Sequence, residues 1–180
     1  MEPRKNKAGH PSKQAEAEQS FMRAYDEHAD AIFRFIAMKL SDREAARDLT
    51  QETFTRAWDF VSGGGVVDQW KAFLFRTAYN LVVDTYRKKK QVSLDEMIDE
   101  HEYEPADTSE THKVDVIEMR RVRKAIDELD ETYKDVVMLR FLEDLPPREI
   151  ARILKLTENV VSVRLHRGVK LLKHALNTTL

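Results

Sequence analysis

Four polar side chains share one face of a helix that the sequence predicts between Ser41 and Gly63. In the stretch DLTQETFTRAW, residues 48–58, Asp48, Gln51, Glu52 and Thr55 fall within about 100° of arc when each residue turns by 100°. The opposite side carries the apolar residues Ala46, Leu49, Phe54, Ala57, Trp58 and Val61. Burial of the apolar side explains why the helix folds, but folding does not require a row of carboxylates and amides on the other side. Such a row can make polar contacts to a partner, or it can simply be solvated.

A second pattern with chemical meaning lies near the C-terminus. The stretch PPREIARILKLTENVVSVRLHRGVKLLKHAL predicts a short helix, a tight turn and a longer helix, which is the layout of a DNA-binding helix-turn-helix over 147–170. We expect Leu156 to fill the turn and Gly168 to allow close approach of the second helix. The buried faces comprise Ile150, Ala151 and Leu154 in the first helix, and Val161, Leu165, Gly168 and Leu172 in the second.

The other face of the second helix is basic and lacks acidic residues from Asn159 to the C-terminus. Cations position a protein on phosphates, whereas short polar groups discriminate between bases. We therefore expect Asn159, Ser162 and Val163 to meet base edges, and Arg164, Arg167 and Lys170 to hold phosphates, while His166 could do either. The alternative is an ordinary amphipathic terminal helix with a basic solvent face.

A third pattern combines aromatic, amide and cationic groups on one helix. Arg76, Tyr79, Asn80, Val83 and Arg87 share a face, and the basic run YRKKK follows, which includes Lys88. Rings stack unpaired bases, amides read their edges and cations hold the backbone, so this face suits single-stranded nucleic acid. Alternatively, tyrosines here only cover the edge of a core. The preceding loop SGGGVVDQ is either a bare connector or a segment whose backbone approaches a flipped base.

Helical periodicity dominates the chain, so we expect an all-α fold of two small helical domains joined by an acidic flexible linker. We predict a disordered tail (1–20), a helical bundle (21–91), the linker (92–113) and a second helical domain (114–180). Ser41 and Glu44 resemble a capping box at the start of the helix that carries the polar row, and Gly63 to Gly65 are expected to end that helix. Thr157 is the expected N-cap of the C-terminal helix. The C-terminal domain divides into helices over 114–129, 131–143, 147–154 and 158–175.

Composition excludes several classes of protein. The chain has 180 residues, a formal net charge of −2 and no cysteine, so disulfides and thiolate chemistry are absent. No apolar run approaches the ~20 residues of a membrane span, and the N-terminus lacks the apolar core of a signal peptide. We expect a cytoplasmic protein with no membrane insertion, no metal and no cofactor.

These patterns in this order resemble the extracytoplasmic function (ECF) sigma factors of the sigma-70 family. DLTQETFTRAW, AFLFRTAYNLVVDTYRKKK and EIARILKLTENVVSVRLHRGVKLLK carry the resemblance, which spans about residues 21–176. It implies that the bundle is sigma domain 2 and that its first motif docks on the coiled-coil clamp of the largest subunit of RNA polymerase. The implied core-binding residues are Asp48, Leu49, Gln51, Glu52, Thr55 and Arg56.

The resemblance also implies that the third helix melts the promoter −10 element, and that the helix-turn-helix is sigma domain 4, which reads the −35 element. Tyr79 replaces the usual arginine and Phe73 a common tryptophan, while Ser162 and Val169 stand where the family often has cations. The implied −10 residues are Arg76, Tyr79, Asn80, Val83, Asp84, Arg87 and Lys88. The implied partners are core RNA polymerase, promoter DNA and an anti-sigma factor.

Two other functions remain open at this point. A free-standing regulator would use only the helix-turn-helix and would not need the row Asp48, Gln51 and Glu52, nor Asn80 and Arg87. A hydrolase built on Asp26, His28 and Asp30 has the residue types but no recurring ligand spacing and no nucleophile beside a base.

Overall fold

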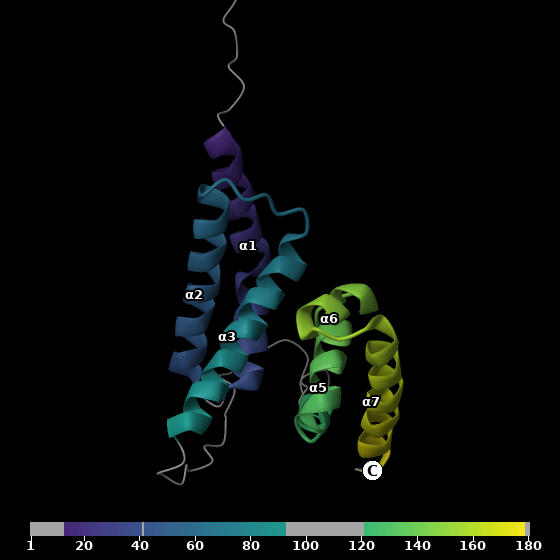
Figure 1. Ribbon diagram of the computed structural model, residues 1–180. Helices are drawn as coiled ribbons and strands as arrows, with labels where there is room; N and C mark the ends of the chain where they lie inside the picture. The colour runs from purple at the N-terminus through teal and green to yellow at the C-terminus, as the bar shows by residue number, and fades with distance from the viewer. Residues whose placement is uncertain (1–12, 41, 93–120, 179–180) are drawn as a thin grey trace, which may run out of the picture.

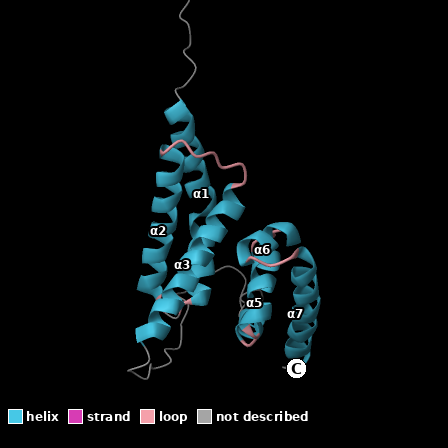
Figure 2. Ribbon diagram, viewed as in Figure 1, coloured by secondary structure: helices cyan, strands magenta, loops and turns pink. Residues whose placement is uncertain are grey.

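The computed structural model describes residues 13–40, 42–92 and 121–178, and all regular structure in these ranges is helical (Figures 1 and 2). The N-terminal unit comprises α1 (Lys13–Lys39), α2 (Arg43–Ser62) and α3 (Trp70–Val92). The C-terminal unit comprises a helical segment 121–127, α5 (Glu131–Val137), the π-helical turn η1 (Met138–Leu142), α6 (Pro147–Leu154) and α7 (Glu158–Thr178). The expected linker lies outside the described residues except for Val92.

The N-terminal unit is a bundle whose apolar stripes meet at its centre. Phe35 of α1 and Phe75 of α3 pack edge to face, with ring centroids 5.3 Å apart, and both are fully buried. Burial of each such side chain contributes about 1.5–3 kcal/mol. The other buried members include Ile32, Ile36, Phe54, Ala57, Leu74, Ala78 and Val82.

The predicted tail of residues 1–20 is wrong for residues 13–20, because α1 begins at Lys13 rather than near Phe21. The segment KQAEAEQS consists mainly of strong helix formers, which extend the helix beyond its apolar stripe. Ser20 also accepts a hydrogen bond of 2.8 Å from the Trp70 indole nitrogen, which ties the added turns to α3.

Two of the predicted helix ends need correction. The N-cap of α2 is Asp42, not Ser41, which lies outside the described residues: the Asp42 carboxylate accepts from the amides of Glu44 at 2.9 Å and Ala45 at 3.1 Å. In the C-terminal unit the helix expected over 131–143 is α-helical only to Val137 and continues as η1. The glycines do end α2, and Gly64 adopts the left-handed φ of 93°.

The expectations for the last helix are confirmed. The Thr157 hydroxyl accepts from the Val160 amide at 3.3 Å and so caps α7. A Cβ added at Gly168 would lie 2.8 Å from Val137 Cγ2, so a side chain there would force α7 away from α5. Glycine at this position therefore sets how closely α7 packs against α5.

The two units lie against each other. Figure 1 shows α5 and α6 beside α3, with α2 on the far side of the bundle from them. The contacts join α3 to α6 and the end of α1 to α5. The sequence predicted the units but not this arrangement.

Candidate nucleic-acid and polymerase interfaces

The row of polar residues on α2 is at the surface, as its pattern suggested. Asp48, Gln51, Thr55 and Arg56 are exposed, and Glu52 is half-exposed with an ion pair to Arg56 at 2.7 Å. Leu49 is partly buried against the core. We call these six residues the α2 ridge. The five polar residues lie outside the buried core, so the fold leaves this side of the ridge available to a partner.

A groove of about 950 Å³ runs between α1 and α2 beside this ridge, and Gln51 and Thr55 help to line it. Its apolar wall includes Phe21, Tyr25, Phe54 and Trp58. Phe21 and Trp58 pack with ring centroids 5.2 Å apart, and Tyr25 and Phe54 with centroids 4.7 Å apart. The groove becomes visible once α1 and α2 are packed together.

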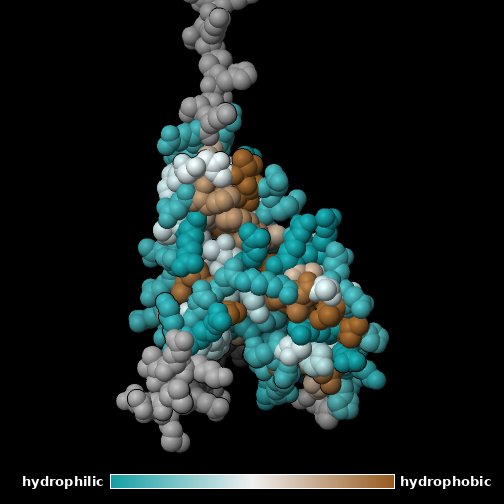
Figure 3. All heavy atoms as spheres, in the orientation of Figure 1, coloured by the Kyte–Doolittle hydropathy of each residue, from teal (hydrophilic) through white to brown (hydrophobic). Residues whose placement is uncertain are grey.

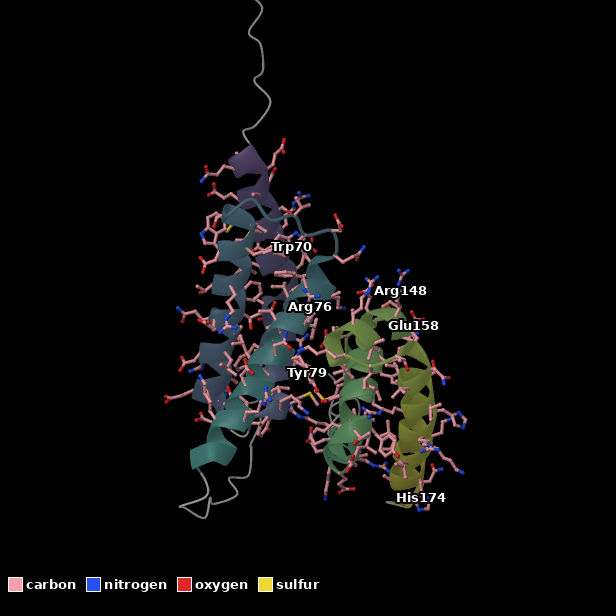
Figure 4. All side chains as sticks on the ribbon, viewed as in Figure 1. Trp70, Arg76, Tyr79, Arg148, Glu158 and His174 are labelled. Atoms are coloured by element: carbon pink, nitrogen blue, oxygen red, sulfur yellow. The ribbon has the colours of Figure 1, made fainter. Side chains whose placement is uncertain are left out.

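The face of α7 that we expect to read duplex DNA is open to solvent. Asn159, Ser162, Val163, His166, Arg167 and Lys170 are exposed, and Arg164 is half-buried. Val161 and Gly168 lie on the opposite, buried face. α7 is the helix of the C-terminal unit farthest from α3 in Figure 1, and Figure 4 shows Glu158 at its start and His174 toward its end. The exposed and buried faces of α7 are those that the sequence pattern predicted.

The face of α3 that we expect to read single strands is partly covered. Tyr79, Asn80 and Val83 are half-buried, whereas Arg76, Asp84, Arg87 and Lys88 are exposed. Figure 4 shows Arg76 and Tyr79 on the side of α3 that faces the C-terminal unit. Burial, and then the negative charge of Asp135 in α5, raise the pKa of Tyr79. The structure thus brings Tyr79 to a carboxylate of the other unit.

Two aromatic rings pack together beside the loop before α3. Phe60 of α2 and Phe73 of α3 have ring centroids 5.3 Å apart, and a Cβ at Gly65 would fall 2.5 Å from the Phe60 ring. The backbone of Gly65 therefore approaches a ring of the chain itself, and an approach of the loop to a flipped base stays a prediction. Phe60 and Val66 are large exposed hydrophobic residues, and Figure 3 shows hydrophobic residues gathered where α2 joins α3.

Sequence reasoning missed the residues that join the two units. Lys39 of α1 is buried, and its ammonium donates to Glu131 and, at 2.6 Å, to Asp135 of α5. Burial lowers the pKa of Lys39, but the two carboxylates outweigh this and raise it. The hydroxyl of Tyr86 in α3 donates to the Lys39 carbonyl. No local pattern marks Lys39, because its partners lie 92 and 96 residues away.

Family comparison agrees with the two-unit architecture. Residues 24–92 match Sigma-70 region 2, and residues 119–172 match Sigma-70, region 4. The chain belongs to the sigma-70 family. Both regions of this sigma-70 protein correspond to units that the structure forms, and the curated relatives place it in the ECF group.

Among these relatives, the ECF RNA polymerase sigma factor BldN of Streptomyces coelicolor is 29% identical over 170 residues, which is 91% of this chain but 62% of BldN. The chain therefore spans less than two thirds of that relative. RNA polymerase sigma factor SigV of Bacillus subtilis is also 29% identical, over 82% of this chain and 85% of SigV.

A solved structure shares the fold over both units. It is the sigma factor RpoE of Bartonella quintana in complex with the anti-sigma factor NepR, with a TM-score of 0.72 and 20% sequence identity. The likeness covers 88% of this chain and 98% of that one.

Across residues 13–40, 42–92 and 121–178, no group of three or more acidic or histidine side chains is arranged to hold a metal ion. His28, considered above for a hydrolase, pairs instead with Glu27 at 3.9 Å, and burial lowers its pKa. Within the same ranges, no helix has both the length and the apolar character of a membrane span.

Proposed function

We propose that this sigma-70 family protein is a promoter-specificity subunit that works only when bound to core RNA polymerase. The α2 ridge docks on the clamp of the largest polymerase subunit, α7 reads the −35 duplex, and α3 captures unpaired −10 bases. The observation that supports this proposal is the exposed polar side of the α2 ridge, on a chain that also has an exposed basic face on α7 and an aromatic and cationic face on α3. The chain itself carries out no bond chemistry and acts in the cytoplasm.

Two DNA contacts on one polymerase-bound chain support each other. Once α7 holds the upstream duplex, the second contact is intramolecular and benefits from a high effective concentration. This gain offsets an unpairing cost of a few kcal/mol as α3 captures bases that leave the stack. The −10 residues are those predicted above, with Asn80 and Tyr79 nearest to the bases and Arg87 and Lys88 on the backbone.

An anti-sigma factor is the proposed regulatory partner. RpoE of Bartonella quintana has its fold in common with this chain and was solved bound to NepR. A protein that covered the α2 ridge or the α7 face of this chain would block polymerase or promoter binding. The absence of cysteine places any thiol-based sensing in that partner.

The test is charge reversal in the α2 ridge. Glu52→Lys removes the ion pair to Arg56 and puts a cation on a surface that we expect to meet basic groups of polymerase. We expect affinity for core polymerase to fall at least about a hundredfold, or about 2.7 kcal/mol, measured by gel filtration and titration with labelled full-length protein.

The matched control is Glu128→Lys, which makes the same charge change at an exposed residue of the C-terminal unit. It should bind core polymerase like the wild type. Wild-type affinity of Glu52→Lys would overturn the clamp assignment.

A free-standing regulator is the second candidate, because α7 is open while the reading face of α3 is partly covered. Such a protein would bind duplex promoter DNA without polymerase and would not co-elute with core enzyme. Co-elution of the wild-type chain excludes this candidate.

A further inference from the structure

The loop between α2 and α3, residues 63–69, begins with three glycines, and Val66 after them is 81% exposed. Glycine has more conformational freedom than other residues, so such a segment does not hold its own shape. At its first end the loop is tied to α2, because the Gly65 amide donates to the Phe60 carbonyl at 2.9 Å. The path of the rest of the loop depends on its other end.

The other end of the loop is Trp70, the first residue of α3, which lies half-buried beside α1 (Figure 4). Its indole N–H donates to the Ser20 hydroxyl at 2.8 Å, and its ring packs on Phe21 with centroids 6.2 Å apart. A tryptophan N–H that is taken from water usually has a hydrogen-bond partner. Ser20 supplies that partner and so fixes the orientation of the indole.

Phe73 connects the two ends of the loop. Its ring centroid lies 6.2 Å from that of Trp70 and 5.3 Å from that of Phe60. We call these three residues the ring row. The row ends at the loop backbone, because a Cβ at Gly65 would fall 2.5 Å from the Phe60 ring. Closely packed rings transmit small displacements, so the orientation that Ser20 sets for the first ring affects the last one.

The ring row lies next to the residues that we expect to contact −10 bases. Phe73 precedes Asn80 by seven residues, or about two helical turns, so both lie on the same side of α3. The loop is the segment expected to approach a flipped base. It crosses the end of the bundle at which α1 begins (Figure 1).

The first turns of α1 contribute little to the buried core. Within residues 14–20, five side chains are exposed, and only Ala17 and Ser20 are half-buried. The Ser20 hydroxyl is nevertheless used in a contact that reaches α3. This contact gives the added turns a role that burial of apolar area does not.

We propose that Ser20 and Trp70 are positioning residues for −10 recognition. The start of α1 braces the ring row, and the ring row holds the loop and the first turns of α3 in the shape that captures a base. This inference rests on the proposed function, because it takes α3 and its loop to be the −10 reader. Neither residue is assigned a contact to DNA.

A brace of this kind acts through pre-organisation. The apparent dissociation constant for −10 bases is the intrinsic one divided by the fraction of chains whose loop is in the competent shape. Loss of one neutral hydrogen bond changes such an equilibrium by about threefold to tenfold. The change should be confined to the −10 element, because the −35 contacts are proposed for α7 and the polymerase contacts for the α2 ridge.

The experiment compares holoenzymes made with the wild-type chain, Ser20→Ala, Ser20→Thr or Trp70→Phe. Ser20→Thr keeps a hydroxyl, and Trp70→Phe keeps an aromatic ring but removes the N–H. The DNA is a duplex selected from random sequences by its binding to the wild-type holoenzyme. Permanganate reactivity measures −10 opening, and substitution of each −10 base in turn measures base preference.

We expect Ser20→Ala and Trp70→Phe each to reduce −10 opening by about threefold to tenfold and to weaken base preference. Ser20→Thr should retain wild-type opening. The double variant Ser20→Ala with Trp70→Phe should be no worse than the poorer single variant, because both changes remove the same bond. The matched control Gln19→Ala truncates an exposed side chain on the same helix and should behave like the wild type.

Two further measurements separate positioning from a general loss of stability. Affinity for core polymerase and for the −35 duplex should be the same for Ser20→Ala as for the wild type. The chain has two tryptophans, so a ¹⁵N-labelled sample gives two indole N–H signals. Ser20→Ala should shift one of these signals and accelerate its exchange with water.

Unchanged opening and base preference in Ser20→Ala would overturn the proposal, and so would additive effects in the double variant. A loss of core affinity as large as the loss of opening would show a structural role only, which also overturns it. Absence of −10 opening by the wild-type holoenzyme on the DNA that it binds would reject the proposed function of α3. Opening by the wild type that Ser20→Ala does not alter would reject the brace alone.

Discussion

α7 and α3 both carry side chains that we propose contact nucleic acid, but the structure exposes them to different extents. The basic face of α7 is open to solvent, whereas Tyr79, Asn80 and Val83 of α3 are half-buried near the C-terminal unit. The proposed ligands also differ, because we propose duplex DNA for α7 and unpaired −10 bases for α3. The half-buried face is the one with the proposed single-stranded ligand.

The way each helix is held also differs. α7 packs on α5 through Gly168, where the fit is steric. α3 meets the C-terminal unit at α6, beside a groove of about 270 Å³, and the nearby ion pair to α5 comes from Lys39 at the end of α1. The first contact fixes α7 within its own unit, whereas the second joins the two units.

The largest expected effect tests the fixed side of this comparison. Gly168→Ala places a Cβ 2.8 Å from Val137 Cγ2 and 3.3 Å from Tyr133 Cβ. Overpacking of this kind lowers the free energy of unfolding by about 1–3 kcal/mol. We expect a lower thermal midpoint and weaker duplex binding, measured by circular dichroism and fluorescence anisotropy. Asn177→Ala, at an exposed position of the same helix, is the control. An unchanged thermal midpoint for Gly168→Ala would show that α7 can shift without loss of stability.

A smaller effect distinguishes the proposed duplex binding by α7 from the proposed single-strand binding by α3. Arg167→Ala should weaken duplex binding at all sequences and reduce the slope of log K against log salt by about 1, because one phosphate contact is lost. Asn80→Ala should leave duplex binding of the free chain unchanged and should impair melting only in the holoenzyme. Anisotropy titrations over a range of salt concentrations measure the first, and permanganate reactivity the second. Equal effects of both substitutions on the free chain would contradict the comparison.

The smallest expected effect is a gradual loss of stability at alkaline pH. The carboxylates of α5 raise the pKa of Lys39 above its usual 10.5, against burial, which lowers it. Burial raises the pKa of Tyr79 and Tyr86 above their usual 10.0. A group with a raised pKa stabilises the folded chain fully below its ordinary pKa, and that contribution is lost as pH rises through the raised value.

All three groups therefore stabilise the folded chain up to about pH 10 and lose this contribution above it. The thermal midpoint of the wild type, measured by circular dichroism, should fall above that pH, and it should fall less in Lys39→Glu, which lacks the titrating ammonium. A fall on acidification from neutral pH, with no change at alkaline pH, would contradict the assignment of Lys39 as the group that joins the two units.

Sequence reasoning predicted the exposed and buried faces of α2 and α7, because the periodicity of apolar residues is a local signal. This periodicity separated the exposed row of α2 from its buried side, and the same pattern on α7 separated Val161 from Ser162. The prediction was less reliable at helix ends, where Asp42 replaced Ser41 as the cap and α1 began at Lys13. Capping residues one position apart are chemically equivalent, and a helix of good formers extends beyond its apolar stripe.

Periodicity and motifs were enough to predict most of the helices, their apolar faces and the family that the chain resembles. The burial of Lys39, the position of Ile153 in a groove shared with α3 and the nearness of Tyr79 to Asp135 follow only from the packing of the helices. The physical reason is the range of the interactions. Periodicity records the side of a helix that avoids water, but it does not record the element that covers it. A charge's burial depends on partners that lie more than 90 residues away along the chain.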